Sequence, residues 1–232
     1  MENIVINVKN VGEIEAVAFD IDGTLYPQWK LHIRAIFNYV FHCIFYLHYG
    51  IVRSKMHGIK PAANFMDLQA KKMAERVRKS PEEVQKKLDR IVYKGLAPYF
   101  NHIPCYKNVP ETFKKLKEAG LKIALLSDFP PEQKGEIWGI KKYCDVILGT
   151  EALGALKPDS YSFIKMAEQL GVEPSKILYV GNSYKYDVVG AHNAGMKTAY
   201  LLPLRYRLFK KQIKDSEICF SNYRQFMDIV LK

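Results

Sequence analysis

Three short apolar segments, each ending in small or polar residues, constrain the fold of this chain more than any other feature. They are residues 16–20 (AVAFD), 122–128 (KIALLSD) and 176–182 (KILYVGN). Each is rich in aliphatic residues and lacks polar alternation, which predicts strands buried on both faces, as in the centre of a parallel sheet. Residues 145–148 and 198–201 predict two further strands.

Helical patterns separate these strands, and each stops at a glycine: residues 109–119 before Gly120, 159–170 before Gly171 and 184–194 before Gly195. A last strand and helix are expected within residues 217–231. Strands that alternate with helices of this length predict an α/β fold, a Rossmann-like open parallel sheet. Ligands of such sheets bind outside the carboxyl ends of the strands.

Residues 28–106 interrupt this alternation and are predicted to be helical throughout, with helices near 31–52, 62–79 and 81–94. Ser80 and Pro81 form a good helix start for the third of these. We therefore expect a core built from residues 1–27 and 107–232, with residues 28–106 inserted as an all-helical cap domain. The cap holds 14 Lys and Arg against 5 Asp and Glu, so it carries most of the chain's net charge of +11.

Residues 33–52 have the length and aromatic content of a membrane span, but they include Arg34, Asn38, His42 and His48. Charged groups near the centre of a span are costly, so we expect a largely buried helix of a soluble domain. The alternative is a membrane-surface helix, because basic residues flank its aromatic ones. Binding to a membrane surface is the less favoured of the two.

Composition and charge narrow the functional classes. Hydrophobic residues make up 48% and charged residues 25% of the chain, which excludes a disordered protein. The basic balance favours anionic partners such as a small phosphorylated metabolite, whereas no recognised nucleic-acid-binding module is present. The basic run at residues 205–211 is expected to be a solvated loop.

Four scattered cysteines form no CxxC motif and lie beside aromatic or aliphatic residues: Cys43, Cys105, Cys144 and Cys219. We expect buried free thiols rather than disulfides or a zinc site, which suits a reducing compartment. The N-terminal residues lack the pattern of a signal peptide, and a cytoplasmic location is expected. The sequence does not indicate an oligomeric state.

Two carboxylates, Asp20 and Asp22, follow the first predicted strand, and Gly23 permits a turn that brings both to one centre. A carboxylate can attack phosphorus to form an aspartyl-phosphate. Its neighbour can protonate a leaving oxygen and later deprotonate water. Paired acids also suit Mg²⁺, which prefers oxygen ligands. The simpler interpretation of this pair is a capped strand-to-turn junction.

The ends of the other predicted strands, and the segments that follow them, carry residues that could bind phosphate or Mg²⁺. Ser127 and the backbone N–H groups near it could hold phosphate oxygens, although Ser127 could also be only a helix N-cap. Lys157 could neutralise phosphate, or be an ordinary surface lysine. Asn182 and Asp187 could complete a Mg²⁺ site, or be a helix cap and a surface acid.

These four motifs, in this order, resemble the haloacid dehalogenase superfamily of hydrolases across residues 14–202. The resemblance rests on DIDGTLYP, LLSDFP, the lysine of KP and GNSYKYDVVGAHNAG, and the insertion resembles that superfamily's helical C1-type cap. It implies that Asp20 is the nucleophile and Asp22 the general acid and base. It further implies phosphate binding and catalytic assistance by Ser127, with Asp128 beside it, and by Lys157.

The resemblance also implies a Mg²⁺ ion held by Asp20, Asp22 through its carbonyl, Asn182 and Asp187. Thr24 is expected to add a hydrogen bond near the Asp22 carboxyl. The fourth motif of the superfamily usually begins Gly-Asp, whereas this chain has Gly-Asn at 181–182, which removes one negative charge from the metal site. That change favours assignment to the dehalogenase branch of the superfamily, whose members need no metal.

Asp22 argues against that branch, because a halide needs no proton to leave and a phosphate ester does. The sequence therefore favours a Mg²⁺-dependent phosphatase that acts on a small phosphate monoester through an aspartyl-phosphate. DIDGTLYP resembles the pyrimidine 5′-nucleotidase-like branch, so a nucleotide or a sugar phosphate is a first expectation for the substrate. Two alternatives stay open: a phosphomutase, and a catalytically weakened binding module that uses the basic aromatic cap.

Overall fold

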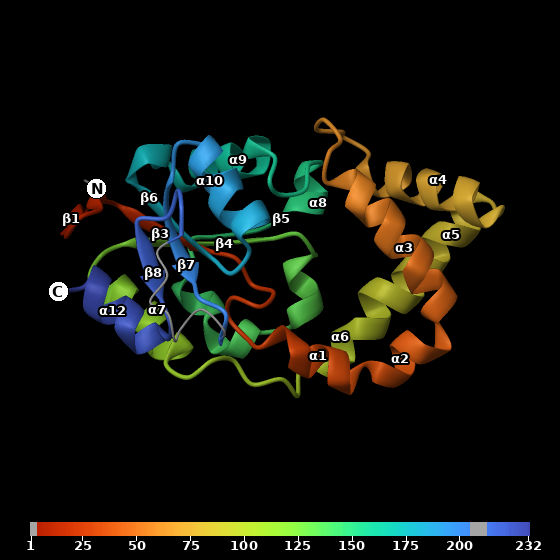
Figure 1. The fold of residues 1–232 in the computed structure, drawn as a ribbon, viewed down its shortest axis with the longest axis horizontal. Coiled ribbons are helices and arrows are strands. Elements are labelled where there is room, and N and C mark those ends of the chain that lie inside the picture. The colour runs from red at the N-terminus through yellow and green to blue at the C-terminus, as the bar shows by residue number, and fades with distance from the viewer. Residues whose placement is uncertain (1–3, 205–212) are drawn as a thin grey trace.

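The computed structural model, which describes residues 4–204 and 213–232, contains one open sheet of six parallel strands (Figure 1). These strands are β3 (Ala16–Phe19), β4 (Lys122–Ser127), β5 (Val146–Gly149), β6 (Ile177–Gly181), β7 (Lys197–Leu201) and β8 (Ile218–Phe220). Their spatial order is β5-β4-β3-β6-β7-β8. The chain runs outward from β3 through β4 to β5 and then returns to β6 on the other side of β3. The sheet confirms the predicted α/β fold, and its switch in direction lies at β3.

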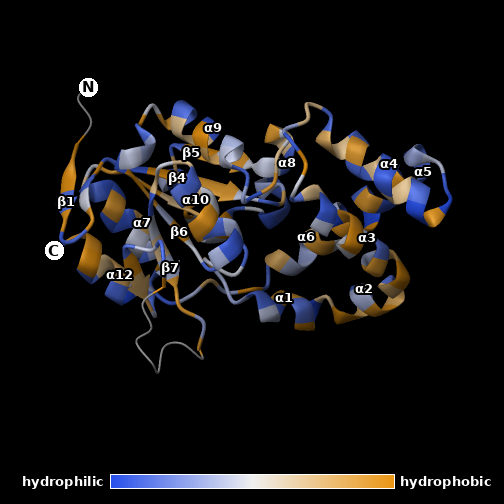
Figure 2. Ribbon diagram, turned by 45° about the horizontal axis from the view of Figure 1, so that its top comes forward, coloured by the Kyte–Doolittle hydropathy of each residue, from blue (hydrophilic) through white to orange (hydrophobic). Residues whose placement is uncertain are grey.

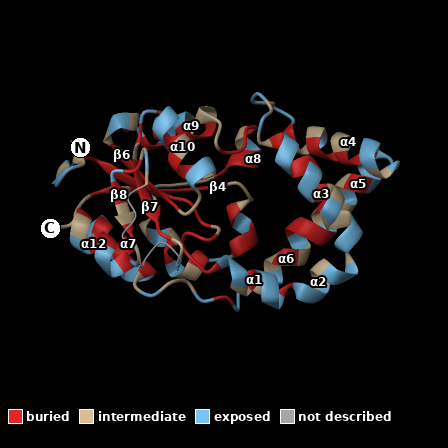
Figure 3. Ribbon diagram, in the orientation of Figure 1, coloured by how far each residue is buried: buried red, intermediate tan, exposed pale blue. Residues whose placement is uncertain are grey.

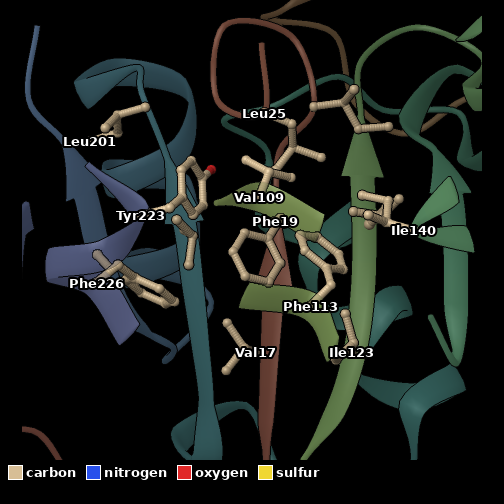
Figure 4. Close-up of a cluster of buried hydrophobic side chains, with 14 of the residues drawn as sticks. Val17, Phe19, Leu25, Val109, Phe113, Ile123, Ile140, Leu201, Tyr223 and Phe226 are labelled. Carbon is tan, nitrogen blue, oxygen red and sulfur yellow. The ribbon is translucent and has the colours of Figure 1, made fainter. Parts of the chain in front are cut away.

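Helices cover both faces of this sheet, α7 (Val109–Glu118) and α12 (Tyr223–Val230) on one face and α9 (Ser160–Leu170) and α10 (Val189–Asn193) on the other (Figure 1). Successive strand residues point to opposite faces, so Val17 and Phe19 of β3 pack toward α7 and α12. Figure 4 shows Phe19 against Phe113, with their ring centroids 4.6 Å apart. Both faces of β3 are fully buried, as its uninterrupted apolar sequence predicts.

Two features near the chain ends complete the core. Ahead of the sheet lies an antiparallel hairpin, β1 (Ile6–Val8) and β2 (Gly12–Ile14), which the sequence did not predict. The strand and helix expected within residues 217–231 are present as β8 and α12. The basic run at residues 205–211 lies outside the described residues.

The segment between β3 and β4 folds into a helical lobe beyond the carboxyl ends of the strands (Figure 1). Its helices are α1 (Gln28–Arg34), α2 (Ile36–Phe41), α3 (Cys43–Met56), α4 (Phe65–Val77), α5 (Pro81–Leu88) and α6 (Lys94–Phe100), with a π-helical turn at Asp89–Tyr93. The lobe has a hydrophobic core of its own, which includes Met56, Met73 and Leu88. The predicted N-cap is confirmed, since the Ser80 side chain accepts a hydrogen bond from the N–H of Glu83. The domain boundaries at residues 28 and 106 stay a prediction.

The expectation of a largely buried helix over residues 33–52 is wrong. This segment is divided among α1, α2 and α3, and α2 buries none of its residues. Only one side of α3 packs inward, through Tyr49, Val52, Arg53 and Met56. Figure 3 shows most of the remaining surface of these helices as exposed or intermediate. None of the helices within residues 4–204 and 213–232 is both long enough and apolar enough to cross a membrane.

The expectation for the cysteines is only partly met. All four thiols are free, as predicted. However, Cys43 is exposed, because it lies on the outward side of α3, and the other three are only partly buried. Burial, followed by the charge of Asp145, raises the pKa of the Cys144 thiol to about 12.

Candidate active site

The predicted site residues of the first, second and fourth motifs meet at the carboxyl ends of the three central strands. Asp20 follows β3 directly, Ser127 is the last residue of β4 and Asn182 follows β6. The backbone N–H of Asp20 donates to the carbonyl of Val180, which holds the ends of β3 and β6 in register. Parallel pairing thus brings Asp20 close to side chains that lie more than 100 residues further along the chain.

Lys157 links two of the predicted acids. Its Nζ lies 2.7 Å from Asp20 Oδ1 and 2.7 Å from Asp187 Oδ1, and all three side chains are at most 6% exposed. Burial raises the pKa of Asp20 to about 7, with Lys157 opposing this and the charges of Asp187 and Asp22 adding to it. Burial alone would lower the pKa of Lys157, but the two acids raise it well above its usual value. Lys157 is therefore a buried cation at the predicted nucleophile rather than a surface lysine.

Asp22 is held by a different set of donors from Asp20. Its Oδ1 accepts a hydrogen bond from the Tyr26 hydroxyl at 2.7 Å, and its Oδ2 accepts one from Ser127 Oγ at 2.9 Å. The ammonium group of Lys134, whose side chain is fully buried, lies 3.1 Å from the same Oδ2. Burial would raise the pKa of Asp22, but Lys134 and the hydrogen bonds together lower it below its usual value. Sequence reasoning assigned no role to Tyr26 or Lys134.

The expectation for Thr24 is wrong. Its hydroxyl lies 2.7 Å from Asp20 Oδ2 and 3.2 Å from Asn182 Oδ1, so it serves the predicted nucleophile rather than the Asp22 carboxyl. Gly23 has a φ of +90°, and a Cβ there would lie 2.4 Å from Asn182 Nδ2. The turn after β3 therefore needs glycine both for its backbone conformation and for the space that Asn182 occupies.

Asp128 and Asp187 use their carboxylates to hold the backbone around the site. Asp128 Oδ1 accepts hydrogen bonds from Thr150 Oγ1 at 2.7 Å and from the N–H of Lys157 at 3.0 Å. Asp187 Oδ2 accepts from the N–H groups of Asn182 and Ser183, at 3.1 and 2.9 Å. Asp128 thus positions the segment that carries Lys157, and of its groups only the backbone N–H could donate to phosphate. Asp187 fixes the loop after β6, and its role as a metal ligand stays a prediction.

The donor atoms at this site fit a magnesium ion. Asp20 Oδ2 and Asn182 Oδ1 converge on the Thr24 hydroxyl, and carboxylate and amide oxygens are ligands that Mg²⁺ accepts. In the part of the chain that the structure describes, no group of three or more His, Cys, Asp or Glu side chains could hold a metal ion. Metal binding here would therefore depend on Asp20, the amide oxygen of Asn182 and backbone oxygens.

The helical lobe contacts the core beside the site through residues that the sequence did not reveal. Arg53 of α3 forms an ion pair with Glu151 of α8 (Thr150–Leu153), and its Nη2 donates to the carbonyl of Asp128 at 2.7 Å. His57 Nδ1 lies 2.5 Å from the carbonyl of Lys157. From the core side, Gln133 Nε2 donates to two carbonyls of the π-helical turn. Polar contacts from the lobe thus reach the backbone next to Ser127 and Lys157.

Comparison with known proteins identifies the family. The fold is that of an α/β protein with paired acids at the carboxyl edge of its sheet, and the model of the haloacid dehalogenase-like hydrolases matches residues 17–201. This chain belongs to that family, which confirms the predicted resemblance.

Two relatives align over almost the whole chain. A glyceraldehyde 3-phosphate phosphatase of Methanopyrus kandleri is 27% identical over 94% of this chain and 97% of its own. The pyrophosphatase PpaX of Halalkalibacterium halodurans is 29% identical over the same shares. A phosphoglycolate phosphatase of Aquifex aeolicus is 36% identical, but over 47% of this chain and 52% of its own.

Solved structures share the fold across both the sheet and the lobe. A haloacid dehalogenase-type phosphatase from Thermococcus onnurineus covers 92% of this chain and 96% of its own, with a TM-score of 0.60 and 21% identity. A 2-haloacid dehalogenase from Pseudomonas syringae covers 94% and 98%, with a TM-score of 0.65 and 18% identity. Phosphatases and dehalogenases both have this fold, so the fold alone does not separate the two activities.

Proposed function

We propose that this protein is a Mg²⁺-dependent phosphatase that hydrolyses a small phosphate monoester through an aspartyl-phosphate on Asp20. The observation that carries the proposal is the separation of two adjacent acids into different surroundings. Asp20 faces Lys157, whereas Asp22 faces Ser127 and Lys134. One acid is thereby placed for attack and the other for proton transfer, and relatives that align with nearly the whole chain include a named phosphatase.

In the first step, a carboxylate oxygen of Asp20 attacks phosphorus, and the bond from phosphorus to the leaving oxygen breaks. Asp22, in its protonated form, gives its proton to that oxygen, so the product leaves as an alcohol. Lys157 holds the attacking carboxylate and neutralises part of the charge that gathers there. The product of this step is an aspartyl-phosphate with an ionised Asp22.

In the second step, ionised Asp22 takes a proton from water, and the water oxygen attacks the phosphorus of the aspartyl-phosphate. The bond from phosphorus to Asp20 breaks, inorganic phosphate leaves and both acids return to their starting states. The hydrogen bond from Tyr26 and the ion pair with Lys134 keep Asp22 ionised for this step. The lowered pKa of Asp22 therefore suits the hydrolysis of the intermediate.

Substrate binding would prepare Asp22 for the first step. The Ser127 hydroxyl, which donates to Asp22 in this structure, is the predicted phosphate-binding group. When it turns to a phosphate oxygen, Asp22 loses one of the bonds that lower its pKa. The negative charge of the phosphate raises the pKa of Asp22 further. Ser127 would thus couple phosphate binding to protonation of the general acid.

Asp20, the Asp22 carbonyl and Asn182 would hold Mg²⁺. Mg²⁺ would supply charge neutralisation at the phosphoryl oxygens. Asp187 would support this site indirectly, since it fixes the backbone of Asn182 and orients Lys157. The three relatives described above act, by their names, on glyceraldehyde 3-phosphate, pyrophosphate and phosphoglycolate. These compounds, with nucleoside monophosphates and sugar phosphates, form the first substrate panel.

The test is hydrolysis of p-nitrophenyl phosphate with and without Mg²⁺, by the natural protein and by Asp20→Asn. We expect Mg²⁺-dependent turnover that falls by at least about 10³-fold in the variant, because the nucleophile is lost. Asp228→Asn, which removes an exposed acid of α12, is the matched control and should keep full activity. Turnover that survives in Asp20→Asn would contradict the proposal.

Other outcomes would identify the alternatives. Transfer of labelled phosphate from a bisphosphate to a second substrate, without net hydrolysis, would identify a phosphomutase. Release of halide from 2-chloropropionate without phosphatase activity would identify the dehalogenase branch. Absence of both turnover and Mg²⁺ binding would favour a protein that has kept the fold as a binding module.

A further inference from the structure

The outward face of α1, α2 and α3 carries an apolar stripe, which we define as Ile33, Phe37, Val40, Phe41, Ile44 and Leu47. These side chains are between 61% and 80% exposed. Figure 2 shows α2 and the start of α3 largely in the hydrophobic colour, and Figure 3 shows the same helices largely exposed. Isolated exposed apolar residues are ordinary, but six within fifteen residues of consecutive helices are typical of an interaction surface.

The stripe is separate from the face that builds the lobe. Apart from the neighbours Val40 and Phe41, its members recur at steps of three or four residues, as on one side of a helix, although the path is divided into three helices at Ala35 and His42. The opposite side of α3 buries Tyr49, Val52 and Met56 in the core of the lobe. None of the catalytic side chains belongs to the stripe, so its function is distinct from the chemistry at Asp20.

A groove of about 490 Å³ adjoins the stripe and is strongly basic. Phe41 and Ile44 form part of its wall, and its lining also includes Arg76, Arg78, Lys79, Lys87 and Arg90 but no Asp or Glu. Lys79 pairs with Glu83 at 3.4 Å. Among the described residues, the other four cations form no ion pair. Apolar side chains and unpaired cations therefore lie side by side on one surface.

This combination decides what kind of surface can cover the stripe. Apart from Arg53, which is buried and paired with Glu151, the charged residues of α1 to α3 are Lys30, Arg34 and Lys55, and none is acidic. If two copies of the lobe paired through this face, like charges would be brought together, which is unfavourable. An anionic lipid bilayer offers the complement of both features, since it presents phosphate groups over a hydrocarbon interior.

We propose that this face of the helical lobe docks on an anionic lipid bilayer. The stripe enters the boundary between headgroups and acyl chains, and the cations of the groove contact lipid phosphates. The chain lies on the bilayer and does not span it, which agrees with the lack of a spanning helix among residues 4–204 and 213–232. Docking in this manner leaves the active-site residues unused, so the proposal stands or fails independently of the phosphatase activity.

The test is co-sedimentation of the full chain with vesicles of phosphatidylglycerol and phosphatidylcholine in equal parts, compared with vesicles of phosphatidylcholine alone. We expect binding to the anionic vesicles that weakens as salt is raised. Phe41→Glu with Ile44→Glu should weaken this binding by at least about tenfold, because two apolar anchors become anions. Arg76→Gln with Arg90→Gln should weaken it by about fivefold for each charge removed.

Ile164→Glu is the matched control. It replaces an exposed apolar residue with an acid on α9, which packs on the sheet and lies outside the helical lobe. It should bind vesicles as the natural protein does. Thermal melting followed by circular dichroism should show that all variants fold, because every substituted side chain is exposed. Neither readout requires enzyme activity.

Three results would overturn the proposal. The first is no binding to the anionic vesicles, and the second is equal binding to both vesicle types. The third is a dimer in light scattering that the Phe41→Glu, Ile44→Glu variant abolishes, together with no difference between this variant and the natural protein on vesicles. That last result would assign the stripe to self-association.

Discussion

The fully buried ammonium group of Lys134 lies 3.1 Å from Asp22 Oδ2, and the Ser127 hydroxyl lies within 3.4 Å of the same ammonium group. Lys134 also lies over the rings of Phe100 and Phe129. A lysine held in this way is shielded from solvent, so its charge acts directly on the predicted general acid. The site therefore has two buried lysines, one for each acid of the DxD motif.

The first prediction is that Lys134→Met changes the pH dependence of turnover. Because Lys134 lowers the pKa of Asp22, its removal raises that pKa, and Asp22 then ionises only at higher pH. The acid limb of the pH profile of kcat reports the ionisation of Asp22, the base of the second step. This limb should move to higher pH. The measurement is a pH–rate profile with p-nitrophenyl phosphate.

Lys141→Met is the control for this change, because Lys141 pairs with Glu136 at the surface. Its profile should match that of the natural protein. Lys134→Met should also lower the free energy of unfolding by about 2 kcal/mol, since a largely buried carboxylate loses its cation. An unchanged acid limb in Lys134→Met would show that Lys134 has only a packing role.

The second prediction concerns stability and metal removal. The folded state raises the pKa of Asp20 to about 7, mainly through burial, above its usual value of 3.8. A carboxyl with a raised pKa favours folding below its unfolded pKa, and this contribution is lost as the pH rises through the folded value. Without metal, Asp20 should therefore reduce the stability of the protein between about pH 4 and pH 8.

We expect Asp20→Asn to melt higher than the natural protein at pH 8 in EDTA, by about 2 °C or more, with a smaller difference at pH 5. Addition of Mg²⁺ at pH 8 should raise the melting temperature of the natural protein and leave that of Asp20→Asn nearly unchanged. The measurement is thermal unfolding followed by circular dichroism. A difference that does not depend on pH would show that Asp20 keeps an ordinary pKa.

The third prediction concerns Asn182, the departure from the usual fourth motif. Asn182→Asp adds a carboxylate beside Asp20 Oδ2, at the point where the Thr24 hydroxyl meets both side chains. An added negative charge among the proposed ligands should strengthen Mg²⁺ binding, so the concentration for half-maximal activity should fall by about tenfold. Asn193→Asp, which adds the same charge at an exposed position of α10, should leave this concentration unchanged. Equal behaviour of the two variants would remove Asn182 from the metal site.

The sequence predicted the parts of the fold that depend on local patterns. The strands β3, β4 and β6 are buried on both faces, so their uninterrupted aliphatic sequences identified them. Their order along the chain then placed Asp20, Ser127 and Asn182 at one edge of a parallel sheet. The helix that follows Lys157 was also predictable, since Asp159 caps it through the N–H of Tyr161.

The contacts that the sequence could not predict join residues that are distant in the chain or have no periodic pattern. Lys134 lies in a short 3₁₀ helix, and its burial depends on two aromatic rings from separate segments. Arg53 and Glu151 are 98 residues apart, and nothing local marks them as partners. Lysine and arginine are usually exposed, so the residue types alone argued against the burial of Lys134 and of Arg53.

The outward face of α1 to α3 shows a different limit of prediction from sequence. Helical spacing identifies which apolar residues share a side of a helix, but it does not identify which side packs against the protein. In α3 the packed side is that of Tyr49 and Val52, and the side with Ile44 and Leu47 is exposed. Only the placement of the surrounding elements could distinguish these two arrangements.

The last prediction concerns the ion pair between Arg53 of the lobe and Glu151 of the core. Both side chains are at least nine-tenths buried, so removal of either partner leaves a buried charge uncompensated. Arg53→Met and Glu151→Met should each lower the free energy of unfolding by about 3 kcal/mol. The double variant should lose less than either single variant, because it leaves no unpaired charge.

Chemical denaturation of the natural protein, the two single variants and the double variant measures this double-mutant cycle. The exposed pair of Lys115 and Glu111 is its control. Glu111→Gln should cost less than about 0.5 kcal/mol, because solvent screens that pair. Arg53→Met should also lower kcat, since Arg53 donates to the carbonyl of Asp128, whose carboxylate holds the N–H of Lys157. Additive losses in the double variant would show that Arg53 and Glu151 stabilise the fold independently, and that the lobe is held over the site by its other contacts.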